Sequence, residues 1–154
     1  MPLLSSARAA GLPRVPHAGE TAGPESIWSS LRSLHADRIG HGVRCLEDPA
    51  LVAELRDRQI PLEVCPTSSV CLHVVPSMPA HMLPRLLAEG LTVTLNSDDP
   101  PMFNTTLTGG YRAAAHTSGL GPPDLQRLAS NAARACLLPA AEKQKLEAVL
   151  LAAA

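Results

Sequence analysis

The chain has 154 residues, of which 45% are hydrophobic and 18% charged, and its formal net charge is −1. This length and composition are typical of a globular chain with one real hydrophobic core. The near-zero charge balance, the lack of a basic run and the 2% aromatic content argue against nucleic acid or an anionic membrane as the main partner.

The sequence also lacks the usual marks of export or membrane insertion. No apolar stretch approaches the ~18 residues that a membrane span needs. The first residues do not contain the basic region and long apolar core of a secretory signal. The four cysteines are scattered without a CxxC pair, which favours free thiols over a zinc ribbon or a disulfide framework. We therefore expect a cytoplasmic location.

Taken in order, the predicted elements alternate between short strands and helices. Strands are expected within residues 14–17, 38–42, 60–64 and 91–95. Helices are expected to begin at Pro24, after the cap residue Asp48 and near Leu83, the last of these closed by Gly90. Three more helices are expected over residues 106–116, from 122 and from 139. Strands that alternate with helices favour parallel pairing through right-handed crossovers.

Polar residues collect where each predicted strand ends. His17 ends the first strand, His41 ends the second, residues 67–69 follow the third, and the pair Asp98 and Asp99 follows the fourth. Singly, they have ordinary explanations: histidines bonded to the backbone, hydroxyls in a turn, and a solvated Asp-Asp-Pro turn. In parallel α/β folds, however, sites form at the carboxyl ends of the strands. The convergence therefore predicts a site.

The residue types at this edge favour a metal-dependent hydrolase. Imidazole and carboxylate groups suit zinc or a similar divalent ion, and an open coordination position would hold a water of lowered pKa. His17 and Glu20 lie three residues apart on a turn, so both can point into one pocket. We expect Glu20 to act as a proton shuttle rather than as a ligand, because a protonatable carboxyl group can serve as a general acid.

Four strings of residues resemble successive signatures of the adenosine deaminase family, in family order. They are His17–Glu20 (HAGE), Arg38–Gly42 (RIGHG), Cys65–Ser69 (CPTSS) and Asn96–Pro100 (NSDDP). The resemblance runs from about Arg14 to Leu150. It implies hydrolytic deamination of adenosine or a related adenine nucleoside, by hydroxide attack at purine C6 and loss of ammonia, with one Zn²⁺ as cofactor.

The resemblance also implies roles for individual residues. His17 and Asp98 are similar in position to metal ligands, and Glu20 to the acid that protonates purine N1. His41 resembles the histidine that orients and deprotonates the metal-bound water. Asp99 is expected to contact purine N7, and Gly19 is expected to belong to the substrate-binding residues.

The family resemblance implies a (β/α)8 TIM-type barrel, an architecture of ~250 residues. This chain has about four strands and is similar only to the C-terminal half, so residues 1–154 are expected to form one partial barrel domain. The family takes two further metal ligands from a His-x-His pair, and no such pair occurs in this sequence. The ligand set is therefore expected to be incomplete.

A half-barrel would leave a strand at each side of its sheet unpaired, and unpaired strands are templates for association. We expect either a truncated gene product or a half-barrel completed by self-association or by another chain. We expect little or no deaminase activity from the chain alone. The alternative is a non-catalytic remnant that keeps the signatures without turnover.

Overall fold

The computed structural model describes residue 6 and residues 9–152, and it contains a four-stranded parallel sheet surrounded by helices. The strands are β1 (His17–Ala18), β2 (Ile39–His41), β3 (Leu62–Val64) and β4 (Val93–Leu95), and they lie side by side in chain order. All three neighbouring pairs are parallel, as predicted. Each strand is shorter than expected from the sequence, most clearly β1, which begins only at His17.

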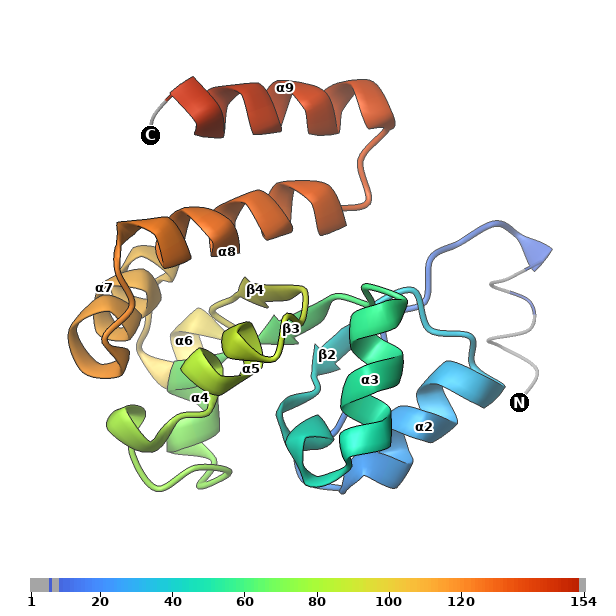
Figure 1. Ribbon diagram of the computed structural model, residues 1–154, viewed down its shortest axis with the longest axis horizontal. Helices are drawn as coiled ribbons and strands as arrows, with labels where there is room; N and C mark the ends of the chain where they lie inside the picture. The colour runs from blue at the N-terminus through green and yellow to red at the C-terminus, as the bar shows by residue number, and fades with distance from the viewer. Residues whose placement is uncertain (1–5, 7–8, 153–154) are drawn as a thin grey trace.

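Helices connect the strands and then form the C-terminal part of the chain (Figure 1). Several of them begin with proline at the first helical position, where no backbone N–H is needed. The helices are α2 (Pro24–Ser33), η1 (Val43–Glu47), α3 (Pro49–Asp57), α4 (Pro66–Cys71), η2 (Met78–Ala80), α5 (Leu83–Ala88), α6 (Pro100–Phe103), α7 (Leu107–Ser118), α8 (Pro122–Ala135) and α9 (Ala140–Ala152).

The register of the sheet separates an apolar face from a polar one. Ile39, Leu62 and Val93 are aligned across β2, β3 and β4, and all three are fully buried in the core against the helices. The next position along each strand points to the opposite face, because side chains alternate along a strand. That layer begins with His17 on β1, which lies opposite Gly40 on β2. The polar face of the sheet therefore carries the first predicted site residue.

The sheet ends in β1 on one side and β4 on the other, so these strands are its edges. Helix α8 covers part of the β4 edge, since the Asn131 side-chain amide donates a hydrogen bond to the Val93 carbonyl oxygen at 2.8 Å. Helix α9 lies beyond α8, away from the sheet (Figure 1), and contains no buried residue. Apolar side chains of this last helix are accessible, with Val149 66% exposed.

None of the described helices combines the length and the apolar character that crossing a membrane would require.

Candidate metal and substrate site

A hollow of about 400 Å³ lies at the carboxyl ends of the strands, where the sequence predicts the site. It is lined by residues of all four strands or of the segments that follow them. The lining residues include His17, Gly40, His41, Cys65 and Asp98. Three of the six predicted site residues thus face one space, and the structure adds Cys65 to them.

His17 and His41 lie next to each other, and local backbone geometry brings them together. Strict alternation would put the side chain of His41 on the helix-covered face with its register partner Ala18. His41 instead has a left-handed backbone (φ 63°), and its ring meets that of His17 edge-on, with centroids 4.9 Å apart. Gly40 leaves room for the ring of His17, because a Cβ at Gly40 would lie 2.6 Å from the His17 Cδ2 atom.

Glu20 projects from the loop after β1 toward His41. Its Oε1 lies 3.6 Å from Nε2 of His41, and the two side chains are 17% and 3% exposed. Neither Glu20 Oε1 nor His41 Nδ1 has a hydrogen-bond partner among the described residues, although both atoms are buried. Buried polar atoms without partners are uncommon and indicate a place for a ligand, an ion or water.

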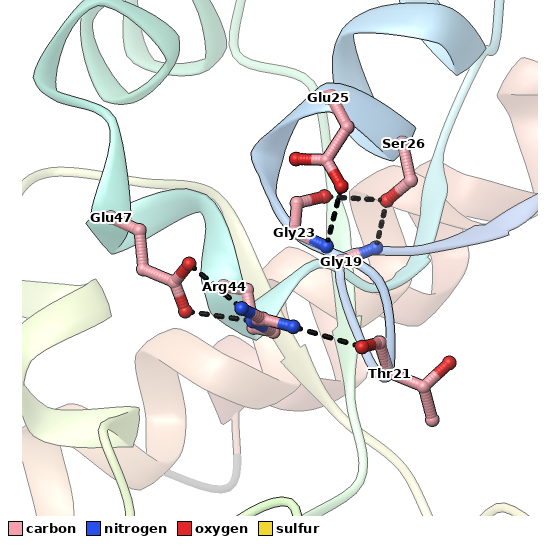
Figure 2. A network of polar contacts seen from close by, with 7 residues as sticks. All are labelled: Gly19, Thr21, Gly23, Glu25, Ser26, Arg44 and Glu47. Atoms are coloured by element: carbon pink, nitrogen blue, oxygen red, sulfur yellow. Dashed lines mark hydrogen bonds and ion pairs between the residues drawn. The ribbon is translucent and has the colours of Figure 1, made fainter.

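The loop that carries Glu20 is fixed by a network of polar contacts (Figure 2). The Gly19 N–H donates to the Ser26 hydroxyl at 2.8 Å, and that hydroxyl donates to the Gly23 carbonyl at 2.7 Å. On the other side, the Arg44 guanidinium donates to the Thr21 carbonyl at 2.8 Å. The backbone on both sides of Glu20 is therefore held, which limits where its carboxyl group can go.

Gly19 itself has a left-handed backbone (φ 65°) and a buried position. Its carbonyl accepts from the Arg44 backbone N–H at 3.0 Å, in addition to the bond that its own N–H makes to Ser26. Both backbone polar groups of Gly19 are thus engaged within the protein. Its predicted contact with substrate stays a prediction.

Asp98 and Asp99 diverge, although they are adjacent in sequence. Asp98 has a left-handed backbone (φ 59°), lines the hollow, and accepts a hydrogen bond from the Ser68 hydroxyl on Oδ2 at 2.6 Å. Asp99 caps α6 by accepting from the Met102 N–H on Oδ1 at 3.0 Å, and it is exposed. The expected Asp-Asp-Pro turn is therefore the start of a helix, with only Asp98 directed to the hollow.

Ser68 and Cys65 are the two site residues that sequence reasoning did not assign. The segment Pro66–Cys71 forms α4, so the alternative of a simple hydroxyl-rich turn at residues 67–69 is wrong. Cys65 lies with His41 and Asp98 in a group whose candidate ligand atoms are all within 4.8 Å. Burial raises the pKa of the Cys65 thiol to about 12, with further contributions from nearby carboxylates, Asp98 foremost, so the thiol is neutral at pH 7.

The donor set fits a divalent metal ion such as zinc. Two groups of possible ligands occur among the described residues, His17 with Glu20 and His41, and His41 with Cys65 and Asp98. They consist of imidazole nitrogens, carboxylate oxygens and one sulfur, which are the ligand types that zinc takes. The buried atoms without partners on Glu20 and His41 point to the same place. No group of three among the described residues contains both His17 and Asp98, the two predicted ligands.

Comparison with known proteins agrees with this geometry. The family described as "Adenosine deaminase" matches residues 3–152. The aminodeoxyfutalosine deaminase of Streptomyces avermitilis is 46% identical over 147 residues, which are 96% of this chain and 41% of that protein. The adenine deaminase of Chlorobium luteolum is 46% identical over 142 residues, 92% of this chain and 42% of that protein.

Solved structures show the same fold. The adenine deaminase of Arthrobacter aurescens superposes with a TM-score of 0.95 at 37% identity, over 97% of this chain and 46% of that one. An amidohydrolase of Burkholderia ambifaria with bound Zn superposes with a TM-score of 0.89 at 25% identity, over 97% and 42%. This chain thus has the architecture of about half of an adenine deaminase barrel.

The chain spans less than half the length of the curated relatives and solved structures that it matches. The match nevertheless covers nearly all of this chain, residues 3–152. The chain belongs to the adenosine deaminase family.

Proposed function

We propose that this chain supplies the acid, the base and part of the metal site of an enzyme that hydrolytically removes the C6 amino group of a purine. The observation that carries the proposal is the position of Glu20 against His41, with Oε1 and Nε2 3.6 Å apart at the edge where Asp98 also lies. Addition of water to C6 of a purine needs a base that takes a proton from the water and an acid that gives a proton to N1.

In the proposed reaction, His41 and Glu20 carry out the proton transfers. His41 accepts a proton from the attacking water as the water oxygen bonds to C6, and Glu20 gives its proton to N1 of the ring. The new C6 hydroxyl then returns a proton to Glu20 as the carbonyl forms. The C6–N bond breaks, and the amino group leaves as ammonia with the proton held by His41. Water and the C6 amine are thereby converted to a C6 carbonyl and ammonia.

His17 and Asp98 are the proposed metal ligands on this chain. A bound zinc ion lowers the pKa of a coordinated water and stabilises developing negative charge. His17 contributes an imidazole nitrogen beside His41, and Asp98 contributes a carboxylate oxygen. Catalytic zinc sites commonly have at least three protein ligands, so a site with these two requires at least one further ligand.

The proposed substrate class is a C6-amino purine, either adenine itself or an adenine nucleoside. Among the relatives, one is named for adenine and another for aminodeoxyfutalosine. Asp99, at the start of α6, is proposed as the contact to purine N7. Gly19 is proposed to border the ring from the loop after β1. The half of a barrel beyond this chain would supply the rest of the pocket.

A chimera tests the proposal. Residues 3–152 would replace the matched segment of the Streptomyces avermitilis deaminase, and release of ammonia would be measured with adenine, adenosine and aminodeoxyfutalosine. We expect turnover of at least one of them. Glu20→Gln should lower kcat by 10²-fold or more, in the range typical for loss of a general acid or base, with zinc content unchanged.

Asp98→Ala in the same chimera should lower both zinc content and turnover. A folded, zinc-loaded chimera that turns over none of the three compounds would contradict the proposal. So would a Glu20→Gln variant as active as the parent. Arg58→Ala serves as the control that should change neither quantity, because Arg58 lies at the far end of α3 and its ion pair among the described residues is with Glu54.

The second candidate is a non-catalytic module that keeps the signatures. The separation of His17 and Asp98 into different ligand groups is the observation that favours it. Zinc titration of the 154-residue chain distinguishes the two. Binding of one equivalent at micromolar or tighter affinity supports the metal site, and no binding supports the non-catalytic module.

A further inference from the structure

Ser68 occupies an unusual position for a serine in a short helix. It lies in the first turn of α4, is fully buried, and donates its hydroxyl proton to Oδ2 of Asp98 at 2.6 Å. A distance of 2.5–2.7 Å is typical of an O–H donor bonded to an ionised carboxylate, which is a stronger bond than one between neutral groups. Asp98 is exposed, so this bond is its main restraint besides the backbone.

The donor is fixed more firmly than the acceptor. Helix α4 starts at Pro66, directly after β3, and packs against α6 and α7. The Ser68 carbonyl accepts from the Leu72 N–H at 2.8 Å, so its backbone is held as well. Asp98 follows β4 on a left-handed residue and leads into α6. The hydrogen bond therefore ties an exposed carboxylate to a packed helix that follows the neighbouring strand.

We propose that Ser68 is the positioning residue for Asp98, holding Oδ2 so that the other carboxylate oxygen is presented to a metal ion beside His41. The inference rests on the proposed function, because it assigns Asp98 as a ligand. Carboxylates that bind metals are commonly held by a second hydrogen bond, and loss of such a partner typically lowers metal affinity 10–100-fold. Without the bond, metal binding has to order the Asp98 side chain at an entropic cost.

The next residue provides a matched control. Ser69 lies in the same helix and is also fully buried, but its hydroxyl has no hydrogen-bond partner among the described residues. Ser68→Ala and Ser69→Ala remove the same atom from the same buried helix. Only Ser68→Ala removes the bond to Asp98.

The experiment measures zinc affinity of the chimera that carries residues 3–152 by competition with a chromophoric chelator. We expect Ser68→Ala to weaken zinc binding by about 10-fold or more and Ser69→Ala to leave it within about twofold, well short of such a loss. In the background of Asp98→Ala, adding Ser68→Ala should cause no further loss, because the hydroxyl acts only through Asp98. Circular dichroism of the metal-free variants checks that each is folded.

If Ser68→Ala does not fold, Ser68→Thr and Ser68→Val are used instead. The two variants have side chains of similar size, and only threonine keeps the hydroxyl. Only the valine variant should lose zinc affinity. Equal zinc affinity of the parent chimera and Ser68→Ala, or an equal loss in Ser69→Ala, would overturn the positioning role and leave the proposed function standing. A parent chimera that binds no zinc would overturn both.

Discussion

At the scale of single residues, burial controls the charge of a histidine outside the site. His81 follows η2, is 4% exposed, and accepts the Leu83 N–H on Nδ1 at 3.0 Å. Its Nε2 is buried without a hydrogen-bond partner among the described residues. Burial lowers the pKa of His81 to about 4, from an ordinary value near 6.5. The folded chain therefore binds a proton at His81 more weakly than the unfolded chain does.

This difference predicts a loss of stability in mild acid. Between pH 6.5 and about 4 the unfolded state binds more protons at this position, so the free energy of unfolding falls as the pH falls. The contribution is fully present at pH 7 and smaller by about 2 kcal/mol at pH 5. His81→Asn, which keeps an acceptor for the Leu83 N–H, should remove this part of the pH dependence.

Urea unfolding at pH 7 and pH 5 measures the effect. His35→Asn is the control, because His35 is exposed and has a left-handed backbone (φ 50°) that asparagine tolerates. It should keep the wild-type pH dependence. An equally steep fall in the His81→Asn variant would show that other groups govern the acid sensitivity.

At the scale of elements, the loop between β1 and α2 is held from one side by Arg44 of η1. The Arg44 guanidinium donates to the Thr21 carbonyl (Figure 2), and the Arg44 backbone N–H donates to the Gly19 carbonyl, so Arg44 bonds the backbone on both sides of Glu20. Glu47 orients the guanidinium through Nε at 2.7 Å and Nη2 at 3.0 Å. The position of the proposed general acid is thus set by a residue that never approaches the hollow.

Arg44→Ala should loosen this loop without unfolding the sheet. We expect several-fold faster amide hydrogen exchange over residues 19–23, where the N–H groups of Gly19 and Gly23 are bonded to side chains of α2. Exchange in β2 and β3 should not change. Arg58→Ala provides the comparison, since it removes an ion-paired arginine of similar exposure at the end of α3. Unchanged exchange in the loop would mean that α2 alone holds it.

Local signals in the sequence predicted most helices and strands, but they did not predict the contacts between residues far apart in the chain. Asp48 caps α3 as expected, because the cap motif and the proline that follows are local features. The carboxyl-end position of His17, His41 and Asp98 followed from the alternation of strands and helices. The bond from Ser68 to Asp98 joins residues 30 positions apart, and no local pattern specifies it. The left-handed backbone of His41 could not be predicted from the sequence either, because most non-glycine residues avoid this conformation.

At the scale of the whole molecule, β1 and β4 are the edges of the sheet, and no further strand of the described residues pairs with either. The chain superposes on 46% of an adenine deaminase, so its polar face corresponds to part of a barrel interior. This geometry favours association with a segment that supplies further strands. It also places His17 next to an edge, where a neighbouring strand would bring additional groups to the site.

The isolated chain should therefore associate with other chains and should not turn over substrate by itself. We expect a zinc-loaded 154-residue chain to leave the absorbance of adenine and adenosine unchanged, and its sedimentation coefficient to rise with concentration. A stable monomer with protected amides at His17 and Leu95, or clear deamination by that monomer, would contradict the expectation.

The contact between Asn131 and the Val93 carbonyl has a consequence for how such a partner can join. Thr92 and Asn96 bond to β3, so the backbone groups of Val93 and Leu95 face the open side, because alternate residues of a strand point to opposite neighbours. With the Val93 carbonyl already occupied by α8, the free positions lie toward Leu95 and the hollow. An incoming parallel strand would thus be guided to one register, and the same pairing that closes the edge would bring the residues at its carboxyl end to the proposed metal site. Assembly and activation would then be a single event.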